Sequence, residues 1–201
     1  MDLALPHGWG TDRRDVDRRF PGDDHGPRPA EEWYRAVTVD APVETVFRWL
    51  CQLKVAPYSY DLLDNRGRQS PRELTPGAEN LAIGQEVMTI FTLADYRWNE
   101  SMVLRMTDQR ALALCGLFIV TYVVEPVGDD RTRLIVKLAV GNIDDQTVRS
   151  RLRRRFLAWG DLMMMRKQLL VFKELAEKDP LRTGQRSLID RCRRFEHCVR
   201  E

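Results

Sequence analysis

Residues 117–140, LFIVTYVVEPVGDDRTRLIVKLAV, predict two β-strands joined by a tight turn. The runs Leu117–Pro126 and Arg131–Val140 are rich in β-branched and aromatic residues, which favour strands. The sequence Gly128-Asp129-Asp130 between them is typical of a short turn, so the two strands should pair as an antiparallel hairpin. Apolar and charged residues alternate in the second run, which indicates a sheet with one covered face and one wet face.

Three upstream runs extend this sheet. They are Glu86–Leu93, Arg97–Thr107 and Arg110–Cys115, and short turns again separate them. Such connections leave no room for crossover helices, so consecutive antiparallel hairpins are the expected topology. Trp33–Val39 adds a strand at the start of the domain, and the sheet should therefore have six to seven strands.

Two short helices are expected after this first strand. Asp40-Ala41-Pro42 ends the strand, because proline cannot join the ladder but suits the first turn of a helix. From Val43 to Leu53 the apolar residues recur at helical spacing. A second helical segment, Tyr58–Asn65, is terminated by Gly67.

One long helix is predicted near the C-terminus, from about Asp145 to Lys178, with Asp144 as its N-cap and Pro180 beyond its end. Its apolar residues cover more than half of its circumference, so we expect the sheet to enclose it. The fold class is α+β, with a curved antiparallel sheet of six to seven strands around a long C-terminal helix.

Length and composition divide the chain into three parts. With 201 residues and 43% hydrophobic content, a single domain over residues 33–179 is the natural expectation. Residues 1–32 are rich in Asp, Arg, Gly and Pro and predict a flexible, poorly ordered arm. Residues 180–201 form a basic tail with apolar residues at near-helical spacing. The net charge of only +2 argues against a dedicated nucleic-acid binder.

The sequence contains no recognisable metal or cofactor motif. Four cysteines without a CxxC pair and three histidines do not assemble a zinc site, and we expect no metal and no cofactor. No apolar run is long enough to span a membrane, and the N-terminus is not built like a secretory signal. These features predict a cytoplasmic protein.

The order of these elements resembles the SRPBCC superfamily, the START-like and birch-pollen-allergen-like helix-grip proteins. The segment Asp40–Phe47 is similar to the usual start of that superfamily. Residues 56–77 together with Leu157–Arg166 are similar to a bacterial branch of it. The resemblance implies a pocket between sheet and helix that holds lipids, steroids, polyketides or other apolar molecules. It does not imply one activity, because this fold hosts binders, carriers, cyclases and adaptors alike.

The first group of candidate ligand-binding residues follows the short amphipathic helix. In a helix-grip fold this segment lies at the cavity mouth, where a tyrosine and a carboxylate can orient a ligand carbonyl or transfer a proton. The alternative is structural, since Tyr60 and Asp64 are four residues apart and can satisfy each other. The group consists of Tyr58, Tyr60, Asp61, Asp64 and Asn65.

Glu100 is a second candidate, because strand alternation places it on the same face as Trp98 and Met102. A carboxylate on the covered face has to be neutralised or paired, and Arg166 on the long helix is the expected partner. Three alternatives stay open: a polar anchor for a ligand, a buried salt bridge, or a bulge that returns Glu100 to solvent.

Apolar candidates complete the predicted lining: Met88 on the sheet, with Trp159 and Met163 on the long helix. The arginines between residues 149 and 155 predict either a solvated face or contact with an anionic partner.

Three functions compete: a binder or carrier of a small apolar ligand, an aromatase/cyclase-like or hydrolytic enzyme, and a protein interaction module with a filled interior. A homodimer is compatible with each of them.

Overall fold

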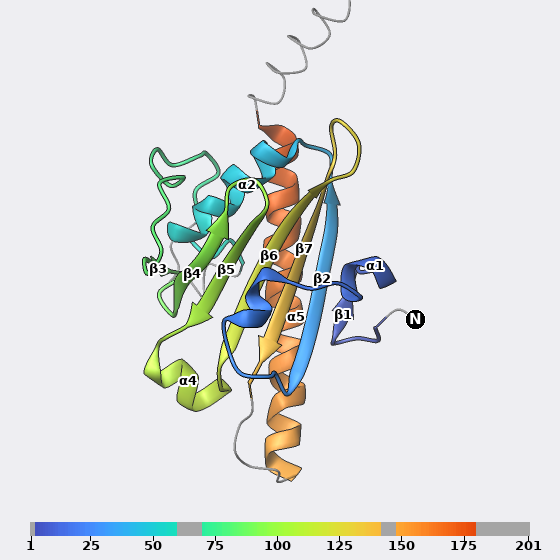
Figure 1. The fold of residues 1–201 in the computed structure, drawn as a ribbon, viewed down its shortest axis with the longest axis vertical. Helices are drawn as coiled ribbons and strands as arrows, with labels where there is room; N and C mark the ends of the chain where they lie inside the picture. The colour runs from blue at the N-terminus through green and yellow to red at the C-terminus, as the bar shows by residue number, and fades with distance from the viewer. Residues whose placement is uncertain (1–2, 60–69, 142–147, 180–201) are drawn as a thin grey trace, which may run out of the picture.

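The computed structural model describes residues 3–59, 70–141 and 148–179. It confirms an α+β fold in which a seven-stranded sheet packs against one long helix (Figure 1). The strands are β1 (Gly8–Trp9), β2 (Glu31–Val39), β3 (Glu86–Val87), β4 (Phe91–Arg97), β5 (Ser101–Met106), β6 (Phe118–Pro126) and β7 (Thr132–Val140). The helices are α1 (Arg13–Val16), α2 (Val43–Cys51), α4 (Gln109–Cys115) and α5 (Val148–Lys178), with short 3-10 turns at η1 (Pro21–Asp24) and η2 (Gln52–Lys54).

The strand order is β1-β2-β7-β6-β5-β4-β3. All neighbouring strands are antiparallel except β1, which runs parallel to β2. The sheet thus forms a meander from β3 to β7, β2 pairs with β7 on its other side, and β1 is the edge strand beyond β2. The hairpin β6–β7 predicted from residues 117–140 is confirmed, with Phe118 opposite Val140 and Pro126 opposite Thr132.

The main core lies between the inner face of the sheet and the helices α2 and α5. Even-numbered residues of β6 and β7 point into it, which follows from the two-residue period of a strand. Phe172 and Leu169 of α5 are fully buried against them. At the end of α5, the indole nitrogen of Trp49 donates a hydrogen bond of 3.0 Å to the carboxylate of Asp179, which ties α2 to the end of the helix.

The outer face of the sheet is covered as well, by the N-terminal segment that crosses in front of β6, β7 and β2 in Figure 1. Phe20 is only 1% exposed and packs in a second, smaller core with Tyr34, Val123 and Ile135. Composition predicts a poorly ordered arm over residues 1–32, whereas the structure adds β1 to the edge of the sheet and packs α1, Phe20 and η1 against the strands. The physical reason is that the outer face carries apolar residues of its own, which the arm removes from water.

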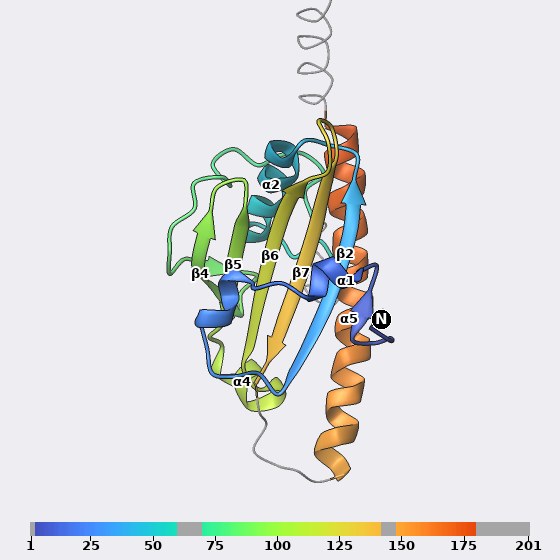
Figure 2. The same ribbon diagram turned by 45° about the vertical axis from the view of Figure 1, so that its right-hand side comes forward.

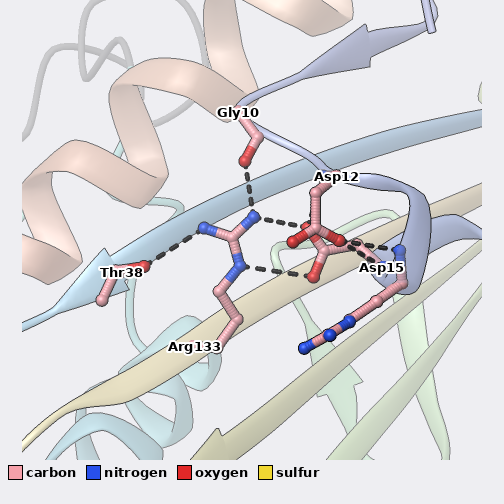
Figure 3. Close-up of polar contacts among 6 residues, drawn as sticks. Gly10, Asp12, Asp15, Thr38 and Arg133 are labelled. Carbon is pink, nitrogen blue, oxygen red and sulfur yellow. Dashed lines mark hydrogen bonds and ion pairs between the residues drawn. The ribbon is translucent and has the colours of Figure 1, made fainter. Parts of the chain in front are cut away.

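Charged contacts fasten the arm to the sheet. Arg133 on β7 forms an ion pair with Asp15 and donates hydrogen bonds to the carbonyl of Gly10 and the hydroxyl of Thr38 (Figure 3). Asp12 caps α1 by accepting hydrogen bonds from two backbone N–H groups, which fixes the turn that presents Asp15. One arginine therefore joins the arm to both β2 and β7.

The segment Arg110–Cys115, predicted as a strand, is the helix α4. Asp108 caps this helix by accepting a hydrogen bond of 2.8 Å from the N–H of Ala111. Gly116 follows it with a φ of 80° and a ψ of −176°, an extended backbone conformation that essentially only glycine adopts. The alternating residues of ALALC suit a strand, but the cap and the glycine decide the local structure.

The strand boundaries before α4 also differ from the prediction. The chain turns at Trp98-Asn99-Glu100, where Asn99 has a φ of 59°, and this turn separates β4 from β5. A continuous strand from Arg97 to Thr107 was predicted, and the strand alternation deduced from it fails for Trp98 and Glu100. It holds within β5, where Met102 and Leu104 face the main core.

We predict that the arm contributes to stability through Phe20. Replacing Phe20 by alanine should lower the free energy of unfolding by about 3–5 kcal/mol, because it leaves a cavity between the arm and the sheet. The matched control is Arg19→Ala, which removes an exposed neighbouring side chain and should change the free energy by less than about 0.5 kcal/mol. Urea unfolding followed by circular dichroism measures both, and equal effects of the two substitutions would show that the arm does not pack.

Candidate functional site

A chain of polar contacts crosses the otherwise apolar space between the sheet and α5. The hydroxyl of Tyr122 on β6 donates a hydrogen bond of 2.7 Å to the side-chain oxygen of Gln168 on α5. The amide nitrogen of Gln168 donates in turn to the carbonyl of Pro57, at 2.6 Å, and lies 3.8 Å from the sulfur of Met88. Gln168 thus joins the sheet, the helix and the segment after η2 at one buried point.

The two segments that meet at Gln168 have unusual backbone conformations. Tyr58, next to Pro57, has a φ of 55°, and Met88 has a φ of 51°. Residues with side chains rarely adopt this left-handed region, and such conformations cluster at binding and catalytic sites. Tyr58 is buried, and its ring lies 5.2 Å from that of Phe172 on α5.

A second polar contact joins the sheet to α5 closer to its start. Arg35 on β2 is fully buried, and its guanidinium donates a hydrogen bond of 2.9 Å to the carboxylate of Asp161. The same guanidinium donates to the backbone carbonyls of His7 and Tyr34. Arg35 shares the inner face of β2 with Trp33, because both are odd-numbered residues of one strand.

Burial shifts the pKa values of these groups. It raises the pKa of the Asp161 carboxyl to about 6, although Arg35 opposes the change, and it lowers the pKa of Arg35. Burial also raises the pKa of Tyr122 above its ordinary value, so that this hydroxyl stays protonated at neutral pH. Tyr122 can therefore orient a polar atom by hydrogen bonding, whereas Asp161 can exchange a proton near neutral pH.

Several of the predicted candidates gather around the inner core. Met102 is buried on β5, Tyr58 is buried beside α5, and Met88 approaches Gln168. Trp98 lies in the β4–β5 turn, where its ring packs 5.1 Å from Phe47 and remains about half exposed. The remaining candidates of the segment after η2 lie outside the described residues: Tyr60, Asp61, Asp64 and Asn65.

The predicted pairing of Glu100 with Arg166 is wrong. The side chain of Glu100 is exposed in the β4–β5 turn, and its carboxylate lies 3.9 Å from the guanidinium of Arg97. Arg166 instead stacks over the ring of Trp9, at 5.6 Å from its centre. Of the three alternatives for Glu100, exposure to solvent is the observed one. The hairpin turn between β4 and β5 exposes this side chain, whereas a bulge was expected to do so.

Trp159 and Met163, which we expected to face the interior, lie on the outer side of α5 and are exposed. The prediction that the sheet encloses this helix is wrong, because the sheet covers only one side of it. Ala158, Leu162, Met165 and Leu169 form that covered side.

The sequence contains signals for the four polar residues that the prediction missed. Arg35 interrupts the inner row of a strand that begins with Trp33, and Tyr122 has the same alternation as Val120 and Val124. Asp161 directly precedes the apolar run Leu162–Met165, and Gln168 directly precedes Leu169 and Leu170. A polar residue at a position that faces the core requires a partner, and pairing these four would have identified both contacts.

Within residues 3–59, 70–141 and 148–179, no group of three or more His, Cys, Asp or Glu side chains is placed to hold a metal ion. None of the helices in these ranges has the length and apolar character needed to cross a bilayer.

Comparison with solved structures shows similarity to aromatase/cyclase-type and other helix-grip proteins. The Zhui aromatase/cyclase from a Streptomyces species is 15% identical, with a TM-score of 0.47 over 74% of this chain and 94% of that chain. The di-domain aromatase/cyclase BexL is 15% identical, with a TM-score of 0.46 over 78% of this chain and 53% of that chain. Protein MLL2253 from Mesorhizobium loti is 14% identical, with a TM-score of 0.45 over 73% of this chain and 98% of that chain. No family model and no curated protein sequence matches this chain.

We predict that Asp161 makes the stability of the protein depend on pH. Its folded pKa of about 6 lies above its ordinary value of 3.8, so the folded state holds this proton more tightly than the unfolded state. The resulting stabilisation is fully present below about pH 4 and is lost as the pH rises through about 6. The loss is on the order of 3 kcal/mol for a shift of about two pKa units.

The measurement is urea unfolding of the wild type and Asp161→Asn across this pH window. The free energy of unfolding of the wild type, relative to the variant, should decrease from about pH 4 to about pH 6. The control Asp24→Asn removes an exposed carboxyl and should keep the pH profile of the wild type. Parallel profiles for the wild type and Asp161→Asn would contradict the prediction.

Proposed function

We propose that this protein binds a small apolar ligand between the inner face of the sheet and α5, with Tyr122 and Gln168 at the polar end of the site. We also infer that it belongs to the SRPBCC superfamily, on the order of its elements and the sequence resemblance at Asp40–Phe47 and Leu157–Arg166. The ligand is expected to be a lipid, a polyketide or a molecule of similar character.

The proposal depends on one observation: two residues with positive φ, Tyr58 and Met88, lie in segments that both contact the buried side chain of Gln168. Gln168 holds the carbonyl next to Tyr58 and approaches Met88, and both of these residues have a positive φ. Strained backbone of this kind costs on the order of 1–3 kcal/mol per residue and persists where surrounding structure enforces it. Here Gln168 anchors both segments at the point where they contact α5.

The chemistry of this point suits an apolar ligand with a polar group. Tyr122 uses its hydroxyl proton for Gln168, and its oxygen lone pairs can accept a hydrogen bond from a ligand hydroxyl. Met88, in the turn between β3 and β4, and Met102, on β5, offer adaptable apolar side chains. Trp98, half exposed in the β4–β5 turn, gives an aromatic surface at the edge of the same core.

A second candidate function is acid–base catalysis of the aromatase/cyclase or hydrolytic type. The observation that favours it is the buried carboxyl of Asp161, whose pKa of about 6 is close to the value that suits proton transfer at neutral pH. Glu100 is too exposed for this role. Asp161 is held by Arg35, so we rank ligand binding first.

The proposal predicts that removal of the Tyr122 hydroxyl weakens ligand binding. Tyr122→Phe should raise the dissociation constant roughly fivefold, since one hydrogen bond is worth about 1 kcal/mol and each 1.4 kcal/mol is tenfold. The matched control is Thr121→Val, which deletes a hydroxyl from the adjacent residue of β6 on the opposite face of the sheet. Its dissociation constant should equal that of the wild type.

Native mass spectrometry against a panel of fatty acids, sterols and aromatic polyketides identifies a bound molecule and measures both variants. NMR of protein labelled on its methionine methyl groups then locates the ligand. Ligand in the proposed site should shift the signals of Met88 and Met102. Absence of uptake from the whole panel, or equal effects of Tyr122→Phe and Thr121→Val, would contradict the proposal.

A further inference from the structure

The outer side of α5 carries a stripe of exposed apolar side chains along the helix. Phe156 is 70% exposed and Met163 is 60% exposed, although most side chains of this type are buried in folded proteins. The stripe consists of Leu152, Phe156, Trp159, Met163 and Leu170.

The spacing of these five residues places them in one line. They follow one another at intervals of four, three, four and seven residues, so at 3.6 residues per turn they lie within about 60° around the helix. The line extends for about 27 Å at 1.5 Å per residue. The first part of α5 extends beyond the ends of β2 and β7 (Figures 1 and 2), where the sheet does not reach it.

Cationic side chains flank the stripe on both sides. On the helix, Arg155 and Arg166 fall along one edge of the line, where Arg166 stays exposed although it stacks over Trp9. Arg153 and Lys167 fall along the other edge. Between residues 152 and 170 there are five bases and one acid, a net charge of +4. Asp161, the one acid, lies on the covered side and pairs with Arg35. Arg154, the fifth base, lies opposite the stripe and pairs with Glu31, so the four flanking bases give the stripe its charge of +4.

We propose that this stripe docks the protein on an anionic lipid surface, with the five apolar side chains in the interface and the flanking cations at the headgroups. Arginine and lysine can extend their apolar stems along the interface while their charges reach the phosphates. Helices that lie on anionic membranes combine Trp, Phe and Leu on one face with Arg and Lys around it. This role goes beyond the proposed ligand binding and depends on a different side of α5.

Charge decides against two other occupants of the stripe. A second copy of this chain would bring one surface of +4 against another of +4. The tail of residues 180–201 has six arginines and three acids, a net charge of +3, and would be repelled in the same way. An anionic surface is attracted by the same charges, at roughly 1 kcal/mol per basic residue near the bilayer.

Co-sedimentation of the full chain with lipid vesicles tests the proposal. The protein should bind vesicles of an equimolar mixture of phosphatidylcholine and phosphatidylglycerol, and should not bind phosphatidylcholine alone. Added salt should weaken the binding, because it screens the attraction between the arginines and the headgroups.

Substitutions on the exposed stripe can be made without loss of the fold. Phe156→Ala should lower the partition coefficient roughly tenfold or more, since it removes one large apolar side chain from the interface. Arg155→Glu reverses one flanking charge and should lower it roughly tenfold as well. The matched control is Ile83→Ala, at an apolar residue that is 67% exposed in the turn before the edge strand β3, and it should leave binding unchanged.

Four outcomes would overturn the proposal. They are no sedimentation with the mixed vesicles, an equal effect of Ile83→Ala and Phe156→Ala, and a dimer in analytical ultracentrifugation that Phe156→Ala dissociates. The fourth is binding of an acidic amphipathic peptide in place of vesicles, which would assign the stripe to a protein partner.

Methionine methyl NMR separates this proposal from the first one. Short-chain phosphatidylglycerol bound at the stripe should shift Met163 and leave Met88 and Met102 unchanged. A ligand in the interior should give the reverse pattern. Shifts of Met88 and Met102 without a shift of Met163 in the presence of phosphatidylglycerol would therefore contradict docking and leave the interior site intact.

Discussion

The ion pair between Arg35 on β2 and Asp161 on α5 determines where the long helix crosses the sheet. Most contacts of α5 with the sheet are made by Leu, Met, Phe and Ala, and such residues tolerate exchange with little loss of stability. A sliding of the helix by one turn would replace one apolar contact by another, but it would leave the fully buried guanidinium without its carboxylate. An uncompensated buried charge costs about 3–5 kcal/mol, so the pair opposes that shift. It does so even though burial disfavours the charged form of both Arg35 and Asp161. The contact between Tyr122 and Gln168, seven residues further along the helix, acts in the same direction.

Once α5 occupies the inner face, the outer face of the same strands remains apolar and needs a separate cover. Tyr34, Val123 and Ile135 lie on that face, and strand alternation puts them opposite the helix. The N-terminal arm supplies the cover with Phe20, and Arg133 with Asp15 fixes its position. Lys137 adds ion pairs of 2.7 Å to Asp23 and 2.8 Å to Glu32 on the same face. A segment that is too polar to form a core of its own is thus ordered by a surface that it completes.

The sequence was sufficient for the class of fold and for the strongest hairpin, because the two-residue period of β6 and β7 is unambiguous. The prediction failed where helix-capping residues outweigh the two-residue alternation of a strand. Asp108 and Gly116 cap the alternating segment between them, which forms the helix α4. The prediction also failed at Trp98-Asn99-Glu100, where one left-handed asparagine divides a run that alternation alone makes continuous. The expected contact was an acid on the sheet and an arginine on the helix, whereas the structure has the arginine on β2 and the acid on α5. A sequence shows that buried charges need partners, but the pairing depends on the crossing of two distant elements.

The composition of α5 follows from its two different surroundings. A helix packed on one face of a sheet needs apolar residues over roughly a third of its circumference, and the sheet side of α5 has them at Ala158, Leu162, Met165 and Leu169. The apolar stripe from Leu152 to Leu170 is exposed and makes no contribution to the packing of α5 on the sheet. Soluble surfaces usually avoid such a contiguous line, since large exposed apolar patches mark sites of association. The same helix therefore combines one face that organises the interior with a second face whose chemistry is adapted to an apolar and anionic environment outside the fold.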